Sequence, residues 1–409
     1  MNARPFFEWR SGKYRLGTVP AVIETMENPA TVTIHPAANA KLVVSEGSRV
    51  QRAAPLCEKP DANSFASISG TVCRIMRIGR LSGPFSTAVM IEGNGASDLP
   101  FQLFDPVADI DSTDTSLLRK NLLSAGFSLP AQGEALLVTA LDTDIDHSAN
   151  RFCFEHNFPM FETGLAVLKK ILGDGKIVIV LGRGASPAHK TICCRFGDVT
   201  EVSARYPDVL PQIIARRHAL LCRFDCVKVI DGCRLAEMAA ALSTGFAPVN
   251  ALISCRVGRS NAPMLVSVAA GTAAGHVAQR LDASLSGRVT RIILGGIMGG
   301  EAADTATQTI TMDHRSLFVD TSPRPPQKNR NATCVNCGQC VRVCPARLRV
   351  DLITAFVERS RPQDAVRLGI DHCIECGLCS AACIRGRELG HLLAFGKSVG
   401  FRRTKKRAK

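Results

Sequence analysis

The sequence predicts a multidomain protein of mixed α/β and β structure that ends in a small, cysteine-rich helical domain. The chain has 409 residues, which is long for one domain. Apolar strand-like segments alternate with helix-like segments through residues 112–250, as in a parallel α/β sheet. Two cysteine runs near the end, at residues 334–345 and 373–383, share the spacing C-x2-C-x2-C-x3-C.

Changes in composition along the chain divide it into six segments. We expect an N-terminal β-sandwich, a Rossmann-like α/β domain, a β-grasp module, a Pro-rich polar linker, the domain of the cysteine runs and a basic tail. Their predicted bounds are residues 1–110, 111–254, 255–321, 322–331, 332–395 and 396–409.

The first segment has the pattern of short strands joined by turns. The stretches V-V-S-E-G-S-R-V (43–50) and A-S-I-S-G-T-V (66–72) are similar to biotinyl and lipoyl domains, whose tight turns need glycine. In such domains a Lys on a hairpin carries the prosthetic group. Lys59, in E-K-P-D, lacks the expected sequence context, so we favour a plain biotinyl-like β-sandwich without a carrier role.

The α/β domain has candidate ligand-binding residues where its strands end. Its periodicity predicts helices at 116–124 and 161–172 and buried strands at 135–141 and 176–181. Parallel sheets bind ligands at the carboxyl ends of their strands. The acidic run D-T-D-I-D (142–146) follows the first strand and either meets a ribose or flavin or caps the next helix. Gly182 and Gly184 follow the second strand, in a turn that either cradles a phosphate or is an ordinary left-handed turn.

The next module resembles a β-grasp unit of the SLBB type. We expect a strand at 263–268, a helix at 273–281 and a second strand that runs into I-L-G-G-I-M-G-G (293–300). Double-glycine turns permit a close approach of backbone, either to a ligand or to a neighbouring domain.

The two cysteine runs have the spacing of ferredoxins with two 4Fe-4S clusters. In that pattern three thiolates of a run bind one cluster, and the fourth binds the other cluster. The predicted ligand sets are therefore Cys334, Cys337, Cys340 and Cys383 for one cluster, and Cys373, Cys376, Cys379 and Cys344 for the other. Two zinc sites are the alternative, since paired C-x2-C motifs also bind structural zinc. Four cysteines in each run favour iron–sulfur.

Charge and cysteine content restrict the compartment and the partners. The formal net charge is +14, but aromatic residues are scarce, with one Trp and two Tyr, so no aromatic platform for stacking nucleic acid bases is visible. The basic end (401–409) is either a disordered solvated tail or an electrostatic contact with an anionic membrane or an acidic partner. Residues 1–10 lack the apolar core of a signal peptide, and cluster ligands need a reducing, cytosolic environment.

Two apolar stretches and the remaining cysteines have simpler explanations. Residues 238–255 and 261–279 are long enough to span a membrane but are interrupted by Gly, Pro, Asn or Ser, so we expect no span. We expect the remaining cysteines to be buried apolar residues. These are Cys57, Cys73, Cys153, Cys193, Cys194, Cys222, Cys226, Cys233 and Cys255.

This order of domains and motifs resembles the RnfC subunit family of the Rnf electron-transport complex over most of the chain. In that family a turn S-G-G-P-M-M-G occupies the place of residues 294–299, and the cysteine runs match closely. The family also includes a cobalamin reductase of propanediol utilisation, and residues 137–146 are similar to the NqrA subunit of a sodium-pumping quinone reductase. The resemblance implies a peripheral subunit on the cytoplasmic side of the inner membrane. Its implied partners are Rnf-type membrane subunits, an iron–sulfur subunit and a soluble carrier: NADH, ferredoxin or flavodoxin.

The resemblance also implies an FMN and NADH site at a loop of the form G-x-G-G-A-G-F-P. The corresponding stretch is S-A-G-F-S-L-P (124–130), preceded by Asn121, Leu122 and Leu123 in place of glycines. Leucines obstruct a backbone that must lie against a phosphate or an isoalloxazine ring, so this departure counts against FMN and NADH binding. If flavin binds, the candidate residues are Gly126, Phe127, Gly182 and Gly184.

Three functional hypotheses follow. The leading one is an electron-transfer subunit of an ion-translocating, Rnf-type oxidoreductase that relays electrons through two 4Fe-4S clusters. The second is a docking scaffold that has lost FMN and NADH binding and connects a partner enzyme. The third is a soluble cobalamin or flavin reductase. Five arginines near the clusters either dock acidic carriers or form solvated surface; they are Arg342, Arg347, Arg349, Arg385 and Arg387.

Overall fold

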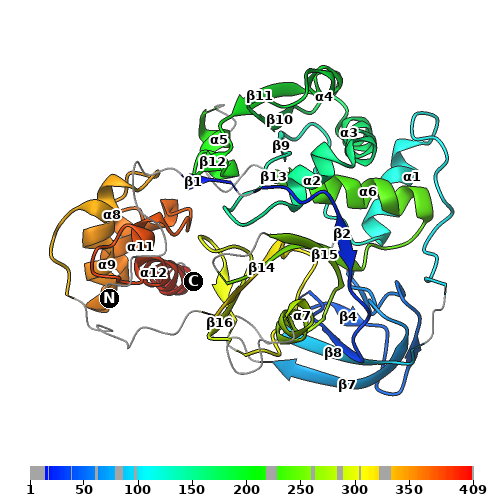
Figure 1. Ribbon diagram of the computed structural model, residues 1–409, viewed down its shortest axis with the longest axis horizontal. Helices are drawn as coiled ribbons and strands as arrows, with labels where there is room; N and C mark the ends of the chain where they lie inside the picture. Colours follow the sequence, from blue (N-terminus) through cyan, green and yellow to red (C-terminus); the bar gives the residue numbers. More distant parts are fainter. Residues whose placement is uncertain are drawn as a thin grey trace.

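The computed structural model places the α/β domain and two β-sheet units on one side and a compact helical domain on the other (Figure 1). It describes residues 14–16, 18–37, 39–59, 63–78, 86–95, 99–217, 228–258, 263–282, 289–303, 305–321 and 333–407, with backbone only for 14–15, 78, 86 and 401–407. The predicted linker at 322–331, the segment 1–10, Cys222 and Cys226 lie outside these residues.

The N-terminal β unit is a small antiparallel structure around one apolar core. Its main sheet has the strand order β3-β8-β7-β5, and β4 pairs with β6. The strands are β3 (Thr31–Ile34), β4 (Lys41–Leu42), β5 (Arg49–Val50), β6 (Cys57–Glu58), β7 (Gly70–Ile78) and β8 (Ser86–Gly93). Alternate residues such as Val72, Val89 and Ile91 are fully buried between the strands, as the period of a half-buried strand requires.

Strands β1 and β2 pair outside this unit. Strand β1 (Tyr14–Arg15) pairs with β12 (Arg205–Tyr206) in the α/β domain, and β2 (Ile23–Thr25) pairs with β15 in the second sheet unit. The predicted segment 1–110 therefore contributes to three parts of the molecule, because the open edges of later strands supply the hydrogen-bond partners of its first strands.

The α/β domain has the predicted parallel sheet. The strand order is β11-β10-β9-β13, and every pairing is parallel. The strands are β9 (Leu136–Thr139), β10 (Ile177–Gly182), β11 (Asp198–Val202) and β13 (Lys228–Asp231). The helices are α1 (Thr115–Ser124), α2 (Ala149–Glu155), α3 (Phe158–Leu172), α4 (Pro187–Cys193), α5 (Pro211–Arg217) and α6 (Gly232–Thr244).

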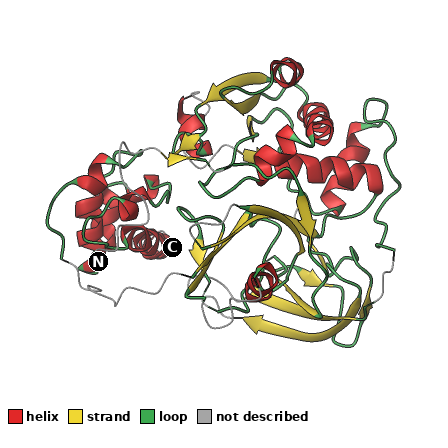
Figure 2. Cartoon of the chain, viewed as in Figure 1, coloured by secondary structure: helices red, strands yellow, loops and turns green. Residues whose placement is uncertain are grey.

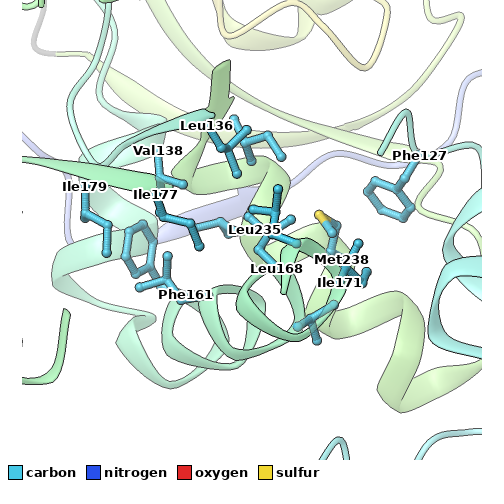
Figure 3. Packing of buried hydrophobic residues seen from close by; sticks show 14 of the residues in the cluster. Phe127, Leu136, Val138, Phe161, Leu168, Ile171, Ile177, Ile179, Leu235 and Met238 are labelled. Carbon is cyan, nitrogen blue, oxygen red and sulfur yellow. The ribbon is translucent and has the colours of Figure 1, made fainter. Parts of the chain in front are cut away.

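Both faces of this sheet are covered, which explains its continuously apolar strands. On one face Leu136, Val138 and Ile179 pack against α3 and α6, where Phe161 and Leu235 are fully buried (Figure 3). The alternate residues Leu137, Val178 and Val180 face Tyr206, Ile214 and, from the helical domain, Leu378. The second face of the sheet therefore supports the cysteine-rich domain.

The second sheet unit is a mixed sheet of order β17-β16-β18-β14-β15-β2 with one helix against it (Figure 2). Its elements are β14 (Asn250–Val257), β15 (Met264–Ala269), α7 (Ala274–Leu281), β16 (Arg291–Leu294), β17 (Glu301–Ala302) and β18 (Ser316–Asp320). The predicted boundary between 254 and 255 falls inside β14. The strand begins at Asn250 because Ala251, Ile253 and Cys255 alternate into one core.

The C-terminal domain consists of two copies of one motif, 39 residues apart. In each copy a cysteine loop leads into a short helix and then into a longer one. The elements are α8 (Gln339–Arg342), α9 (Val350–Glu358), α10 (Pro362–Arg367), η2 (Ile370–His372), α11 (Leu378–Ala381) and α12 (Leu389–Arg407).

The predicted basic tail at 396–409 is not a separate segment, because α12 continues through Arg407. Gly396 and Gly400 lie one turn apart on this helix. A Cβ on Gly396 would lie 2.5 Å from a Val357 methyl, and a Cβ on Gly400 would lie 2.7 Å from a Val366 methyl. The two glycines thus let α9 and α10 pack closely against the last helix. In the described part of the chain, no helix has the length and hydrophobicity of a membrane span.

Candidate iron–sulfur site

Both cysteine loops have the same backbone conformation. Asn336 and Glu375 each have φ of 54°, and Gly338 and Gly377 each have φ of 70°. These left-handed residues turn the chain sharply between cysteines, so that backbone N–H groups point toward sulfur. The Asn336 N–H lies 3.4 Å from the Cys334 sulfur. Hydrogen bonds of this type lower the negative charge on a thiolate and help to set a cluster potential.

Four cysteines line one cavity between the second loop and the first run. They are Cys344, Cys373, Cys376 and Cys379. Cys344 thus lies with the three cysteines of the other run, because the chain turns back after α8 and the Leu348 N–H donates to the Cys344 sulfur at 3.4 Å. This is the arrangement that the crossed ligand assignment requires.

The other four cysteines lie nearer to solvent. Cys334 and Cys337 are exposed, whereas Cys340 and Cys383 are half-buried. Arg387 donates a hydrogen bond to Glu358, which raises the pKa of its guanidinium, and the charges of Cys334 and Cys383 add to that rise. Burial and the Asp351 charge raise the pKa of Cys340, and the nearby Cys334 sulfur adds to this rise. The two groups therefore differ in exposure, with Cys373–Cys379 toward the protein interior.

The chemistry of these donors fits iron–sulfur clusters. Burial, with a smaller contribution from the neighbouring sulfurs, raises the pKa of Cys376 to about 11 and that of Cys379 to about 12. A thiol with such a pKa remains protonated unless a bound cation compensates its charge. Iron supplies that charge, and the eight cysteines of the two runs match the ligand number of two cubane clusters.

The inner cysteine loop contacts two other parts of the molecule. Tyr206 of β12 donates a 2.5 Å hydrogen bond from its hydroxyl to the Cys376 carbonyl oxygen. Gly377 lies against the backbone of Met298, so closely that a Cβ would be 2.1 Å from the Met298 carbonyl oxygen. Leu378, Ile374 and Cys376 pack into the same apolar cluster as Tyr206 and Met298. This loop is thus fixed on the α/β domain and on the glycine-rich turn.

The acidic run and the glycine-rich turn, which lie more than 150 residues apart in sequence, meet in the structure. Asp144 accepts hydrogen bonds from the Met298 and Gly299 N–H groups, at 3.0 and 2.8 Å. Asp146 accepts from Ile297 at 3.3 Å. Of the two alternatives for this run, helix capping holds only for Asp142, which accepts from Asn150 in the first turn of α2. Neither ligand binding nor helix capping, the two alternatives for this run, includes its contact with the glycine-rich turn.

The four candidate flavin residues are not brought together. Gly182 ends β10 at the carboxyl edge of the sheet, and Gly184 follows it with φ of 91° and open space beside it. Next to Phe127, Ser128 accepts a hydrogen bond from Lys228, which begins β13 at the amino edge. The two pairs of residues therefore lie beside different strands, β10 and β13, which β9 separates in the sheet.

The loop around Gly126 does not offer a flavin cradle. A Cβ on Gly126 would lie 2.9 Å from the Asn63 carbonyl oxygen, so another protein segment occupies the space beside this glycine. Phe127 is 1% exposed and lies beneath Arg234. Phe127 and Ser128 line a cavity of about 250 Å³ with Asp231, Arg234 and Arg315, whose charges are already paired. Pockets that hold a cofactor as large as FMN usually have a volume above roughly 300 Å³. These residues do not fit FMN.

The arginines near the cysteines fall into two groups. Arg342, Arg347 and Arg385 are exposed on the domain surface. Arg349 is bound by Asp351, and Arg387 is bound by Glu358, so both have acidic partners within the chain.

The cysteines outside the two runs mostly follow expectation. Five of them are buried: Cys57, Cys153, Cys193, Cys233 and Cys255. Cys73 and Cys194 are exposed, so the expectation is wrong for these two, which lie on strand β7 and at the end of α4.

Comparisons with known proteins agree with these observations for part of the chain. Residues 327–384 match the family model of the 4Fe-4S dicluster domain. A stretch of 95 residues is 23% identical to the C subunit of the ion-translocating oxidoreductase complex of Buchnera aphidicola subsp. Acyrthosiphon pisum (strain APS). That match covers 23% of this chain and spans 20% of the relative. The predicted resemblance to the RnfC family is thereby confirmed over a limited stretch.

Two solved structures are more distantly similar. Both are crystal structures of an NAD+-reducing [NiFe]-hydrogenase, in the air-oxidized and the H2-reduced state. Their TM-scores are 0.36 and 0.38, with 12% and 13% identity, over 66% and 70% of this chain and 56% and 60% of those chains. At these scores the similarity is too distant to assign a common fold.

Proposed function

We propose that the chain relays single electrons through two 4Fe-4S clusters, as a peripheral subunit of an Rnf-type ion-translocating complex at the cytoplasmic side of the inner membrane. The observation that carries this proposal is the cavity that Cys344 of the first run lines together with Cys373, Cys376 and Cys379 of the second run. Each cluster, when bound, takes up and gives up one electron. Cys334, Cys337, Cys340 and Cys383 hold one cluster, and Cys373, Cys376, Cys379 and Cys344 hold the other.

The chain's own residues give the two clusters different tasks. The outer group, with the exposed Cys334 and Cys337, is accessible to a soluble carrier. The exposed arginines Arg342, Arg347 and Arg385 favour an acidic carrier such as ferredoxin or flavodoxin, because complementary charge speeds association. The inner group lies against Tyr206 and Met298, where protein excludes water. Electrons thus pass between the surface and the interior of the assembly.

A relay without its own flavin is favoured over a dehydrogenase that uses NADH. The space beside Gly126 is filled by Asn63, and the two candidate pairs lie beside β10 and β13, which β9 separates in the sheet. We therefore expect another subunit or a soluble carrier to supply electrons. The soluble cobalamin or flavin reductase is the remaining alternative; association with the membrane subunits distinguishes it from the relay.

Anaerobic purification with assays of iron, sulfide, zinc and flavin tests the proposal. We expect about eight irons per chain, no flavin, and clusters that are reduced by ferredoxin or flavodoxin but not by NADH. Bound FMN with reduction by NADH would replace the relay with a dehydrogenase subunit. Zinc in place of iron would refute both. Pull-down of membrane subunits from native membranes tests the place in a complex, and a chain that remains wholly soluble would support the reductase alternative.

A further inference from the structure

Asp144 is buried at the junction of three parts of the molecule. Its side chain is 2% exposed. Its carboxylate accepts hydrogen bonds from its own neighbour Ile145 at 2.7 Å, from Met298 at 3.0 Å and from Gly299 at 2.8 Å. The last two N–H groups belong to the glycine-rich turn of the second sheet unit. One carboxylate thus fixes the backbone of a turn in another domain.

The turn has glycines where Asp144 needs space. Gly296 has φ of 115°, and a Cβ there would lie 2.4 Å from an Asp144 carboxylate oxygen. Gly300 packs against the Gly296 carbonyl oxygen, at 2.2 Å from a hypothetical Cβ. The sequence I-L-G-G-I-M-G-G therefore allows its backbone to wrap a carboxylate of the chain itself.

The other side of the same turn supports the inner cysteine loop. The Met298 residue whose N–H binds Asp144 presents its carbonyl oxygen to Gly377, between Cys376 and Leu378. Gly299 lies near the Glu375 carbonyl oxygen. Asp144 is thus one peptide unit away from the loop that carries Cys373, Cys376 and Cys379, without touching a cysteine.

We propose that Asp144 is a positioning residue for the inner 4Fe-4S cluster and lowers its reduction potential relative to the outer one. This inference rests on the proposed function. The turn held by Asp144 fixes the inner cysteine loop, and the negative charge of Asp144 in a low-dielectric junction opposes the addition of an electron nearby. The outer cluster, at the exposed end of the domain, lies beyond this contact.

Potentiometric titration of the holoprotein, followed by electron paramagnetic resonance of each cluster, tests this role. In Asp144→Asn we expect the inner cluster to be easier to reduce by at least about tenfold in equilibrium constant, which is about 59 mV for one electron. The outer cluster keeps its potential and serves as an internal control. Both clusters keep their iron.

Two further variants make the test specific. Asp142 lies in the same run but is paired with Arg151 at 2.6 Å and does not contact the turn, so Asp142→Asn should leave both potentials unchanged. Asp146 binds the same turn through Ile297 alone, and Asp146→Asn should shift the inner cluster in the same direction by less. If Asp144→Asn does not fold, the potential of the inner cluster in Asp146→Asn decides whether the proposal holds.

The outcomes separate the two proposals. A wild-type protein without iron would refute the relay itself. Two intact clusters whose potentials do not change in Asp144→Asn, or change equally, would overturn the positioning role while leaving the relay standing. An equal shift in Asp142→Asn would also overturn it, because the effect would then be one of buried charge in general.

Discussion

The Tyr206 hydroxyl donates a hydrogen bond of 2.5 Å to the carbonyl oxygen of Cys376. Tyr206 is 1% exposed, and burial, together with the nearby Cys376 and Asp144 charges, raises the pKa of its hydroxyl well above the usual value. It therefore remains a proton donor at all physiological pH values. This contact joins the second face of the parallel sheet to the inner cysteine loop.

Replacing Tyr206 by Phe should loosen that loop. The substitution leaves a buried carbonyl oxygen without its donor, at a cost of roughly 1–3 kcal/mol. We expect faster amide hydrogen exchange at residues 373–379 in Tyr206→Phe, and unchanged exchange at the equivalent residues 334–340. Equal protection of both loops in the variant would show that the hydrogen bond does not hold the domain in place.

The equivalent glycines Gly338 and Gly377 provide a matched pair. Both have φ of 70°, so alanine costs backbone strain of about 1 kcal/mol at either position. A Cβ at Gly338 meets open space, whereas one at Gly377 would lie 2.1 Å from the Met298 carbonyl oxygen. Gly377→Ala should therefore lower the thermal stability and inner-cluster occupancy much more than Gly338→Ala does. Similar losses in the two variants would contradict the packing of the turn on the loop.

Asp144 should make stability depend on pH. Burial, then repulsion by Asp146, raises the pKa of Asp144 to about 6 in the folded protein, above the usual 3.8. Because the pKa is higher in the folded protein, protonated Asp144 stabilises the fold relative to the unfolded chain. This contribution is fully present below the unfolded pKa and is lost as pH rises through about 6. Between about pH 4 and about pH 7 the wild type should lose roughly 2 kcal/mol relative to Asp144→Asn.

Denaturant unfolding of both proteins at several pH values measures this difference. His147 and Asp146 also face Asp144 and are present in both proteins, so the comparison isolates the Asp144 carboxyl group. If the stability of wild type and variant depended on pH in the same way, Asp144 would not be the source of the pH dependence.

Arg315 should be essential for the contact between the α/β domain and the second sheet. It is bound by Asp231 at 3.0 Å and by Glu237 at 3.1 Å, and its side chain is 8% exposed. Arg315→Ala leaves the Asp231 carboxylate without its cation, whereas Glu237 keeps Arg234 at 3.0 Å, and should cost about 3–5 kcal/mol. Arg280 pairs with Glu27 at the surface, so Arg280→Ala should cost less than about 1 kcal/mol. Equal losses of Tm would contradict this difference.

The regular elements could be predicted because their apolar periodicity is local. The helix expected at 161–172 is α3, and the strand expected at 176–181 is β10, within a few residues. The buried parallel sheet follows from strands that are apolar on both faces. The 4Fe-4S dicluster domain at residues 327–384 was predictable for a different reason, since cluster geometry dictates the spacing of the ligands.

The contacts between domains were not predictable from any single stretch. Asp144 and Met298 each lie in a motif that the sequence makes visible, but nothing local indicates that one motif binds the other. Strands β1 and β2 are short and gain their partners from sheets formed much later in the chain. A separate tail was expected because the segment has the charge of a disordered end. That expectation is wrong, because Gly396 and Gly400 allow the last helix to pack closely against α9 and α10.

The most direct test of the crossed two-cluster relay replaces the fourth cysteine of each run. Cys344→Ser and Cys383→Ser are compared after anaerobic reconstitution, by iron analysis and by electron paramagnetic resonance. We predict that Cys344→Ser impairs the cluster held by Cys373, Cys376 and Cys379, that Cys383→Ser impairs the one held by Cys334, Cys337 and Cys340, and that each variant keeps about four irons. If each substitution instead removes the cluster of its own run, or neither changes the iron content, the crossed two-cluster relay is wrong.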